Sequence, residues 1–157
     1  MLSEVAVQHL QDSYTFFKRS SSCLEEADSG YAPKEGMYTV AQLVAHVAQT
    51  YDWFMEGMFS SSGFDLNFEE HMKPVMACTS LEAARKWLKG SVEKAVATVS
   101  SKSDEELMAP LPAGPVMGGA PRMAVFSAIT DHTASHRGSL AVYSRLLGKV
   151  PQMPYMD

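Results

Sequence analysis

The 157-residue sequence contains only two cysteines, Cys23 and Cys78, which lie far apart and form no CxxC motif. This scarcity argues against a disulfide-stapled secreted domain and is typical of a protein from a reducing compartment. The N-terminal residues also lack a basic segment ahead of an apolar core, unlike a signal peptide. We therefore expect a cytoplasmic protein.

Runs of Lys and Arg are also missing, and the formal net charge is −5. Because a phosphate backbone attracts clustered basic side chains, this charge argues against a nucleic-acid partner. No apolar run approaches the roughly 20 residues needed to span a bilayer. Neither nucleic acid nor a membrane is therefore an expected partner.

The composition that remains is ordinary for a globular protein, with 46% hydrophobic and 20% charged residues. Single domains are commonly built from about 100–200 residues, so residues 1–157 are predicted to form one domain. A chain of this length can bury a full hydrophobic core and needs no metal merely to fold.

Apolar residues recur at spacings of three and four in four segments, which is the pattern of amphipathic helices. These segments run from about Ser3 to Ala27, Val40 to Met58, Leu81 to Val99 and Arg122 to Leu147. No convincing alternating strand pattern and no internal repeat is present. The sequence therefore predicts an all-α protein, an antiparallel four-helix bundle.

Hydroxyl residues and glycine mark the helix ends. Thr39 with Gln42, and Thr79 with Glu82, have the form of capping boxes that open the second and third helices. Gly148 follows the fourth helix and is expected to end it.

Two long connections separate these helices. Residues 60–74, which end at a proline, are predicted to be irregular. Residues 100–121 are predicted to form one short helical turn at 103–107, followed by a segment too rich in Pro and Gly to be regular helix. A long connection in a small domain often borders a functional cleft.

The stretch DHTASHRGSL places His132 and His136 four residues apart on the apolar face of the fourth helix. Side chains at this spacing stack on one face with Cβ atoms about 6 Å apart, so both imidazoles can approach one ion at about 2.0–2.1 Å. His46, on the core-facing side of the second helix, is a third candidate. The residues alone leave two interpretations open, a three-histidine metal site or structural histidines packed in the core.

Other features limit the chemistry. His9 and His71 are interpreted as solvated residues without a ligand role. Thr133 stands where the HExxH zinc motif has Glu, so the general base of those metalloproteases is absent and peptide hydrolysis by that route is not expected.

The segments AQLVAHVAQTYDWF and DHTASHRGSLAVYSRLLGKVP resemble the DinB/YfiT-like family of metalloenzymes. The resemblance covers nearly the whole chain and is most specific at HxxxHRG. It implies an up-down-down-up four-helix bundle, often homodimeric. It also implies a divalent metal ion, nickel or zinc among others, bound by one histidine of the second helix and two of the fourth. His46, His132 and His136 match those positions.

The resemblance further implies a metal-dependent enzyme with a small-molecule substrate. Named branches include thiol-dependent S-transferases and an isomerase that use low-molecular-weight thiols, and a metal-bound thiol is deprotonated to the nucleophilic thiolate. Thiol S-transfer is the leading expectation, and a related hydrolase or isomerase reaction is the alternative. Many relatives carry Gln after HRG where this chain has Ser139, so no role of that Gln is carried over.

Residues near the candidate ligands have two interpretations each. Gln49, Thr50 and Trp53 follow His46 by one to two turns and are candidate substrate-binding residues, although ordinary packing within the bundle is the favoured interpretation. Arg137 is expected to pair with an acid on another helix, and the carboxylate of a cofactor is the alternative partner. Gly138 is expected to mark the close approach of a neighbouring helix.

A non-catalytic metal-binding bundle, acting as a sensor or a dimeric interaction module, is the alternative to an enzyme. An enzyme needs an open metal position and a pocket of about 300 Å³ or more beside it. A structural site would be closed by a fourth protein ligand. A helical domain without metal is the third hypothesis.

Overall fold

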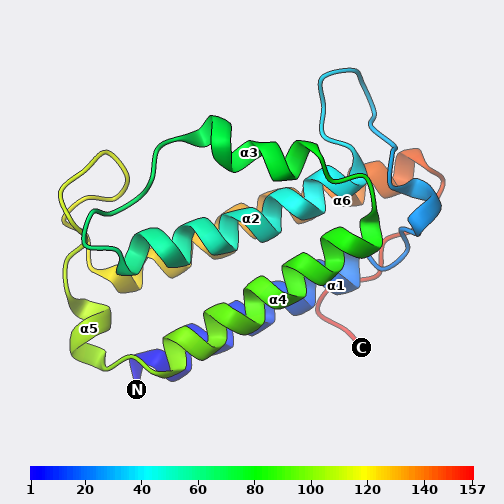
Figure 1. The fold of residues 1–157 in the computed structure, drawn as a ribbon. Coiled ribbons are helices and arrows are strands. Elements are labelled where there is room, and N and C mark those ends of the chain that lie inside the picture. Colours follow the sequence, from blue (N-terminus) through cyan, green and yellow to red (C-terminus); the bar gives the residue numbers. More distant parts are fainter.

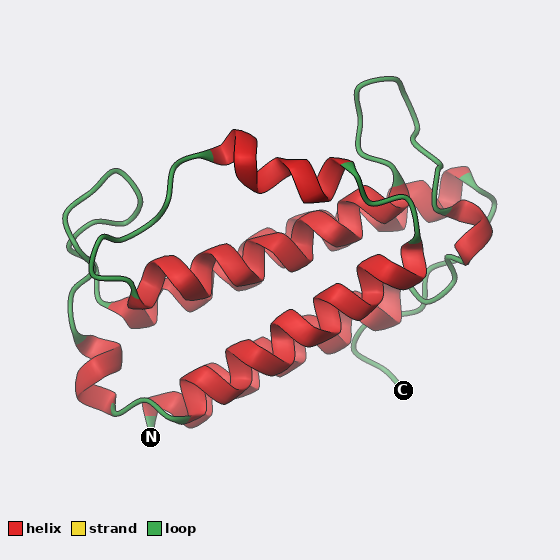
Figure 2. Cartoon of the chain, viewed as in Figure 1, coloured by secondary structure: helices red, strands yellow, loops and turns green.

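A computed structural model describes all residues, 1–157, and contains helices but no β-strand (Figure 1, Figure 2). The four long helices are α1 (Leu2–Ser20), α2 (Val40–Phe59), α4 (Leu81–Ser100) and α6 (Val125–Leu146). The shorter helices are α3 (Phe68–Met76) and α5 (Asp104–Met108), with 3-10 turns η1 (Glu26–Asp28) and η2 (Arg122–Ala124). The predicted all-α four-helix bundle is confirmed. No helix combines the length and the apolar character needed to cross a membrane.

The long helices follow an up-down-down-up order (Figure 1). Around the bundle, α1 packs against α4 and α6, and α2 also packs against α4 and α6. The colours of Figure 1 show α1 and α6 running in one direction and α2 and α4 in the other. The end of α6 therefore lies near the start of α2, where the Tyr143 hydroxyl donates to the Tyr38 carbonyl at 3.1 Å.

Because α2 and α4 run in the same direction, their connection must travel the length of the bundle, and α3 lies within it (Figure 1). The prediction that residues 60–74 are irregular is wrong for the part that forms α3. The Asn67 side chain caps this helix by accepting from the Glu70 amide, and Val75 is fully buried. Pro74 lies inside α3, so its missing N–H removes only one bond of a short helix.

The first helix ends earlier than predicted, at Ser20 rather than Ala27. The Ser21 and Ser22 hydroxyls donate to the carbonyls of Phe17 and Arg19. Such local bonds satisfy the last carbonyls and compete with further helix. The chain then turns through η1 toward α2.

The capping predictions are half correct. Thr39 caps α2 in a full capping box with Gln42, as predicted. The cap of α4 is Ser80 rather than Thr79, because the Ser80 hydroxyl accepts from the Ala83 amide.

Of the two predictions about glycines, one agrees with the structure and the other is wrong. Gly148 has φ +74° just after α6, which suits a helix stop. At Gly138 an added Cβ would meet nothing within 4 Å, so the predicted close approach is wrong. At Gly57 an added Cβ would lie 2.2 Å from the Phe64 ring, and this glycine is where the chain packs closely.

Candidate metal centre

Three histidines from two neighbouring helices meet at one point between α2 and α6. His46 lies in the first half of α2, and His132 and His136 lie one turn apart on α6. The Nε2 atom of His132 is 3.1 Å from Nε2 of His46 and 3.1 Å from Nε2 of His136. The structure thus brings together the three residues that the sequence singles out.

The three rings are half-buried and contact one another nearly edge to face, with centroids 4.4–4.9 Å apart. The Nδ1 atoms of His46 and His132 are buried and have no hydrogen-bond partner. Unsatisfied buried nitrogens cost stability. The group therefore contributes little to the fold by itself.

Burial keeps these imidazoles neutral at pH 7. It lowers the pKa of His46 to about 4, with a smaller effect of the neighbouring His136. It lowers the pKa of His132 to about 3, where both other histidines add to the effect of burial. Burial also lowers the pKa of His136. Neutral imidazole is the form that binds metals, because its lone pair is already free.

The two contacts at His132 cannot both be good hydrogen bonds between neutral rings. Each nitrogen of a neutral imidazole carries either one proton or one lone pair. Nε2 of His132 would therefore have to share a single proton or a single lone pair between His46 and His136. Two nitrogens bound to one tetrahedral ion at about 2.0–2.1 Å are about 3.3–3.4 Å apart. The observed spacing of 3.1 Å is close to that value, so the residues fit a metal ion held by three nitrogens.

No Cys, Asp or Glu side chain joins the three histidines to complete a four-ligand set. Structural zinc sites are almost always closed by four protein ligands, whereas catalytic sites keep a position for water or substrate. The donor set is therefore of the open type.

Tyr38 is a member of the site that the sequence analysis missed. Its ring lies 5.3 Å from the His46 ring at an interplanar angle of 33°. Its hydroxyl approaches the Met72 sulfur of α3 at 4.0 Å, and burial raises its pKa. Tyr38 lies just before the α2 cap Thr39 and outside the helix, so helical spacing from His46 gave no signal for it in the sequence.

The three predicted substrate-binding residues occupy different environments. Thr50 is buried, with 7% of its surface exposed, and Gln49 is half-buried. The Trp53 indole nitrogen donates to the Asp65 carbonyl at 2.7 Å, and its ring packs against Phe64. The Trp53 side chain therefore holds the loop after α2.

Two expectations about neighbouring residues need correction. His71 is not simply solvated, because its Nε2 lies 3.1 Å from the Asp65 carboxylate and its side chain is 23% exposed. Arg137 pairs with no acid, and its guanidinium instead lies over the Tyr155 ring at 5.6 Å. His9 is exposed, as expected.

The Ser139 hydroxyl, at the position where the family often has Gln, donates back to the Ser135 carbonyl at 3.3 Å. It therefore serves its own helix, and no contact with the histidines is made through it.

The main surface cavities lie elsewhere. Five cavities of about 270–540 Å³ are lined by other residues than the three histidines. One of about 340 Å³ includes Trp53 together with the loop that follows α2. The pocket that we expected beside a catalytic ion is not among them.

Comparison with known proteins identifies both the family and the fold. A family model described as the DinB superfamily matches residues 17–140, well over half of the chain. YjoA, a DinB-like protein from Bacillus subtilis, has a similar crystal structure, with a TM-score of 0.68 and 18% sequence identity over 94% of each chain.

YfiT from Bacillus subtilis, described as a probable metal-dependent hydrolase with an unusual four-helix-bundle topology, has a TM-score of 0.65 and 15% identity. That match covers 94% of this chain and 88% of YfiT. No curated protein sequence matches the chain. At these identities the two structures establish a shared fold, and the match to the family model shows that the chain belongs to the DinB superfamily.

Proposed function

We propose that His46, His132 and His136 bind one divalent metal ion and that the protein is a metal-dependent enzyme acting on a small molecule. The observation that carries this proposal is the convergence of three neutral Nε2 atoms, with two contacts of 3.1 Å at His132. Hydrolysis is the reaction class with the most support, because YfiT, which shares the fold, is described as a probable metal-dependent hydrolase.

Three neutral imidazoles add no negative charge, so a bound divalent ion keeps its full positive charge. Such an ion polarises a substrate oxygen and lowers the pKa of bound water to about 7. The chain's own contribution is to present the donors in their neutral form, since burial lowers the pKa of His46 and His132 far below 7. Tyr38 packs beside the His46 ring and helps to fix its orientation.

Nickel and zinc both suit three nitrogen donors. Transfer of a low-molecular-weight thiol is the second reaction class to test, because a divalent ion also deprotonates a thiol. Gln49 is the residue that we retain for substrate contact, since it is half-buried one turn after His46. Thr50 and Trp53 are weaker candidates, because one is buried and the other binds a loop carbonyl.

The alternative is a non-catalytic metal-binding bundle, a sensor or a dimeric module. One observation favours it, because none of the five main cavities is lined by the three histidines. The two hypotheses agree on metal binding and differ on turnover, so binding must be tested first.

Metal analysis of the purified protein tests the site. We expect about one ion per chain in the wild type and in a His9→Ala control, whose histidine is exposed on α1. His136→Ala should lose most of this metal while its circular dichroism stays helical, because only two donors remain. Stoichiometric metal in folded His136→Ala protein would refute the proposal.

Turnover is then measured with the metal-loaded wild type on generic esters and on thiols paired with electrophiles. Rates above those of His136→Ala support an enzyme. Equal rates for both proteins, despite full metal loading of the wild type, would support the non-catalytic alternative.

A further inference from the structure

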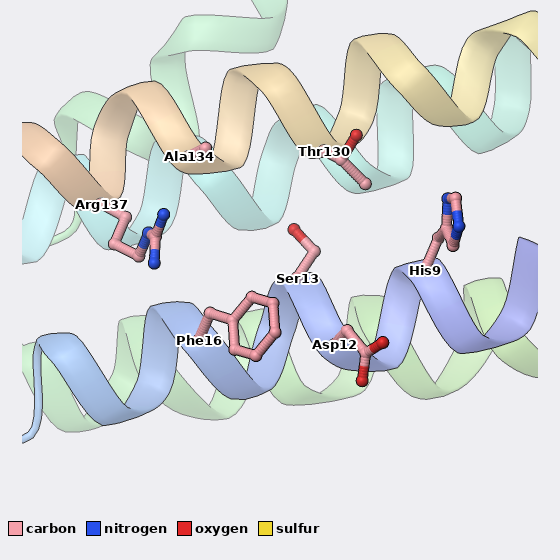
Figure 3. A pocket seen from close by; sticks show the side chains of 7 residues that line it. All are labelled: His9, Asp12, Ser13, Phe16, Thr130, Ala134 and Arg137. Atoms are coloured by element: carbon pink, nitrogen blue, oxygen red, sulfur yellow. The ribbon is translucent and has the colours of Figure 1, made fainter. Parts of the chain in front are cut away.

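A cavity of about 290 Å³ lies between α1 and α6 (Figure 3). The residues that line it come from these two helices alone: His9, Asp12, Ser13, Phe16, Thr130, Ala134 and Arg137. Successive helix residues are separated by about 100°, so this face of α6 is not the face of His132 and His136.

The Arg137 guanidinium in this cavity is unusual among the arginines of the chain. The other four each donate to at least one carbonyl or carboxylate oxygen. Arg137 donates only to the Tyr155 hydroxyl, at a long 3.4 Å, and forms no ion pair. A guanidinium has five donor hydrogens arranged to bind a carboxylate with two parallel bonds. Most of its donors are therefore free for a ligand.

The rest of the cavity offers an apolar wall and polar groups at a distance from Arg137. The Phe16 ring lies beside Arg137 in Figure 3 and contacts the Tyr155 ring edge to face at 4.9 Å. The Ser13 hydroxyl points into the gap between the helices (Figure 3), whereas the Thr130 hydroxyl donates to the Ser127 carbonyl at 3.0 Å and its methyl group faces the gap. Seven residues separate Thr130 from Arg137, so the cavity is about 10 Å long.

A second cavity, of about 410 Å³, adjoins the first, since Ala134 and Arg137 line both. It adds Arg145 and Tyr155 to the same face. Arg137 thus lines two adjoining cavities, and its guanidinium lies over the Tyr155 ring, which in turn contacts Phe16. A ligand with an anionic group and an apolar body matches this arrangement.

One acid, Asp12, lines the cavity and must be reconciled with an anionic ligand. Its carboxylate accepts from the Gln8 amide at 2.8 Å, and in Figure 3 it is turned away from α6. No ion pair joins it to Arg137. It therefore leaves the guanidinium available.

We propose that the α1–α6 groove binds a small organic carboxylate with a flat apolar body. Arg137 binds the carboxylate, and the Phe16 and Tyr155 rings pack against the body. The Ser13 hydroxyl hydrogen-bonds a polar group toward the far end of the groove, where the Thr130 methyl adds an apolar contact. This site is separate from the histidines and does not depend on the proposed metal.

The test uses the full chain, treated with EDTA so that no metal can bind the probe, and 3-phenylpropionate as that probe. Titration is followed by 15N–1H NMR. We expect saturable shifts in the amides of residues 9–16 and 130–137. Neutral 3-phenylpropanamide should bind about tenfold or more weakly, because it cannot form the charge-assisted pair.

Arg137→Gln should reduce the affinity for 3-phenylpropionate about tenfold or more, and Arg137→Lys by less. Lys34→Gln removes the same charge from an exposed position outside the groove and should leave the affinity unchanged. Three results would overturn the proposal: equal affinity in Arg137→Gln, shifts centred on His46 and His132, or groove shifts that follow protein concentration rather than probe. The last would show that a second copy of the chain covers the groove.

Discussion

Replacing His132 by leucine should change the stability of the protein in opposite directions with and without metal. In the metal-free protein, the His132 ring is neutral, half-buried and has a buried Nδ1 atom without a partner. Leucine at this position has no polar atom to satisfy and extends the apolar face of α6. We therefore expect the metal-free variant to be more stable than the wild type, by about 1 kcal/mol at pH 8.

Lower pH should widen this difference. The pKa of His132 is about 3 in the folded protein and 6.5 in the reference state. At pH 5 the unfolded ring therefore takes up a proton that the folded ring does not. The free energy of unfolding consequently decreases as the pH is lowered through this window. At pH 5 the free energy of unfolding is lowered by about 2 kcal/mol for a fully buried ring, and by about half of that for a ring that solvent partly screens. The metal-free variant should then exceed the wild type by about 2 kcal/mol.

Added metal should reverse the order. An ion that binds only the folded state stabilises it by about 2.7 kcal/mol at a concentration 100 times its Kd. For a protein of this length, that corresponds to a rise in Tm of about 5–10 °C. The variant keeps only two donors, so its Tm should rise far less at the same metal concentration.

Thermal unfolding followed by circular dichroism, at pH 8 and pH 5 with EDTA or with zinc chloride, measures all three effects. His9→Leu is the matched control, because the same substitution at an exposed position away from the three histidines should leave the response to zinc unchanged. The reasoning fails if zinc raises the Tm of His132→Leu as much as that of the wild type. It also fails if the metal-free variant is the less stable protein at pH 5.

Two further substitutions test the local packing. Ser80→Ala should destabilise the protein by about 0.5–2 kcal/mol in urea unfolding, because it removes the α4 cap. Thr79→Ala should have little effect. If Thr79→Ala were the more destabilising change, the capping box expected from the sequence would be the correct one. Gly57→Ala should destabilise the protein by about 1–3 kcal/mol, because the added Cβ would lie 2.2 Å from the Phe64 ring. Gly90→Ala, whose added Cβ would meet nothing within 4 Å, should stabilise α4 by up to about 1 kcal/mol. Equal effects at both glycines would contradict the close approach at Gly57.

The four long helices could be predicted because their signal is local. Apolar residues at spacings of three and four define each buried face, and Thr39 with Gln42 fixes the start of α2 within four residues of sequence. The α4 start could not be decided in the same way, since Thr79 and Ser80 are both good caps. Contacts with η1 contribute there, because the Ser29 hydroxyl accepts from the Leu81 amide and η1 also binds the first turn of α4.

The short helix α3 could not be predicted for a related reason. Pro74 is normally a sign of a break, and nine residues give little periodicity. The burial of Val75 against the bundle stabilises the helix, and that contact is made across the fold. Local sequence therefore indicated a loop where tertiary packing forms a helix.

The histidine group was predictable because it interrupts an apolar pattern. Polar residues at two successive inward positions of α6 are unfavourable unless they gain partners, and that conflict is visible in the sequence. Tyr38 and Arg137 carried no such signal. Their surroundings come from Met72 and Tyr155, which lie 34 and 18 residues away along the chain.

The same conflict separates folding from metal binding in this protein. Leu43 and Val47 on α2, and Ile129 and Leu140 on α6, flank the histidines and are at least 97% buried. Each buried aliphatic side chain contributes about 1.5–3 kcal/mol, which exceeds the cost of about 1 kcal/mol that we assign to the unpartnered nitrogen of a neutral half-buried imidazole. The bundle therefore folds without the ion, unlike a zinc finger, whose core is too small. Nε2 of His132 already lies 3.1 Å from Nε2 of each of the other two histidines, so binding of an ion requires little further ordering of the chain. The free energy of metal binding is therefore not consumed in folding and remains available for interactions with a ligand.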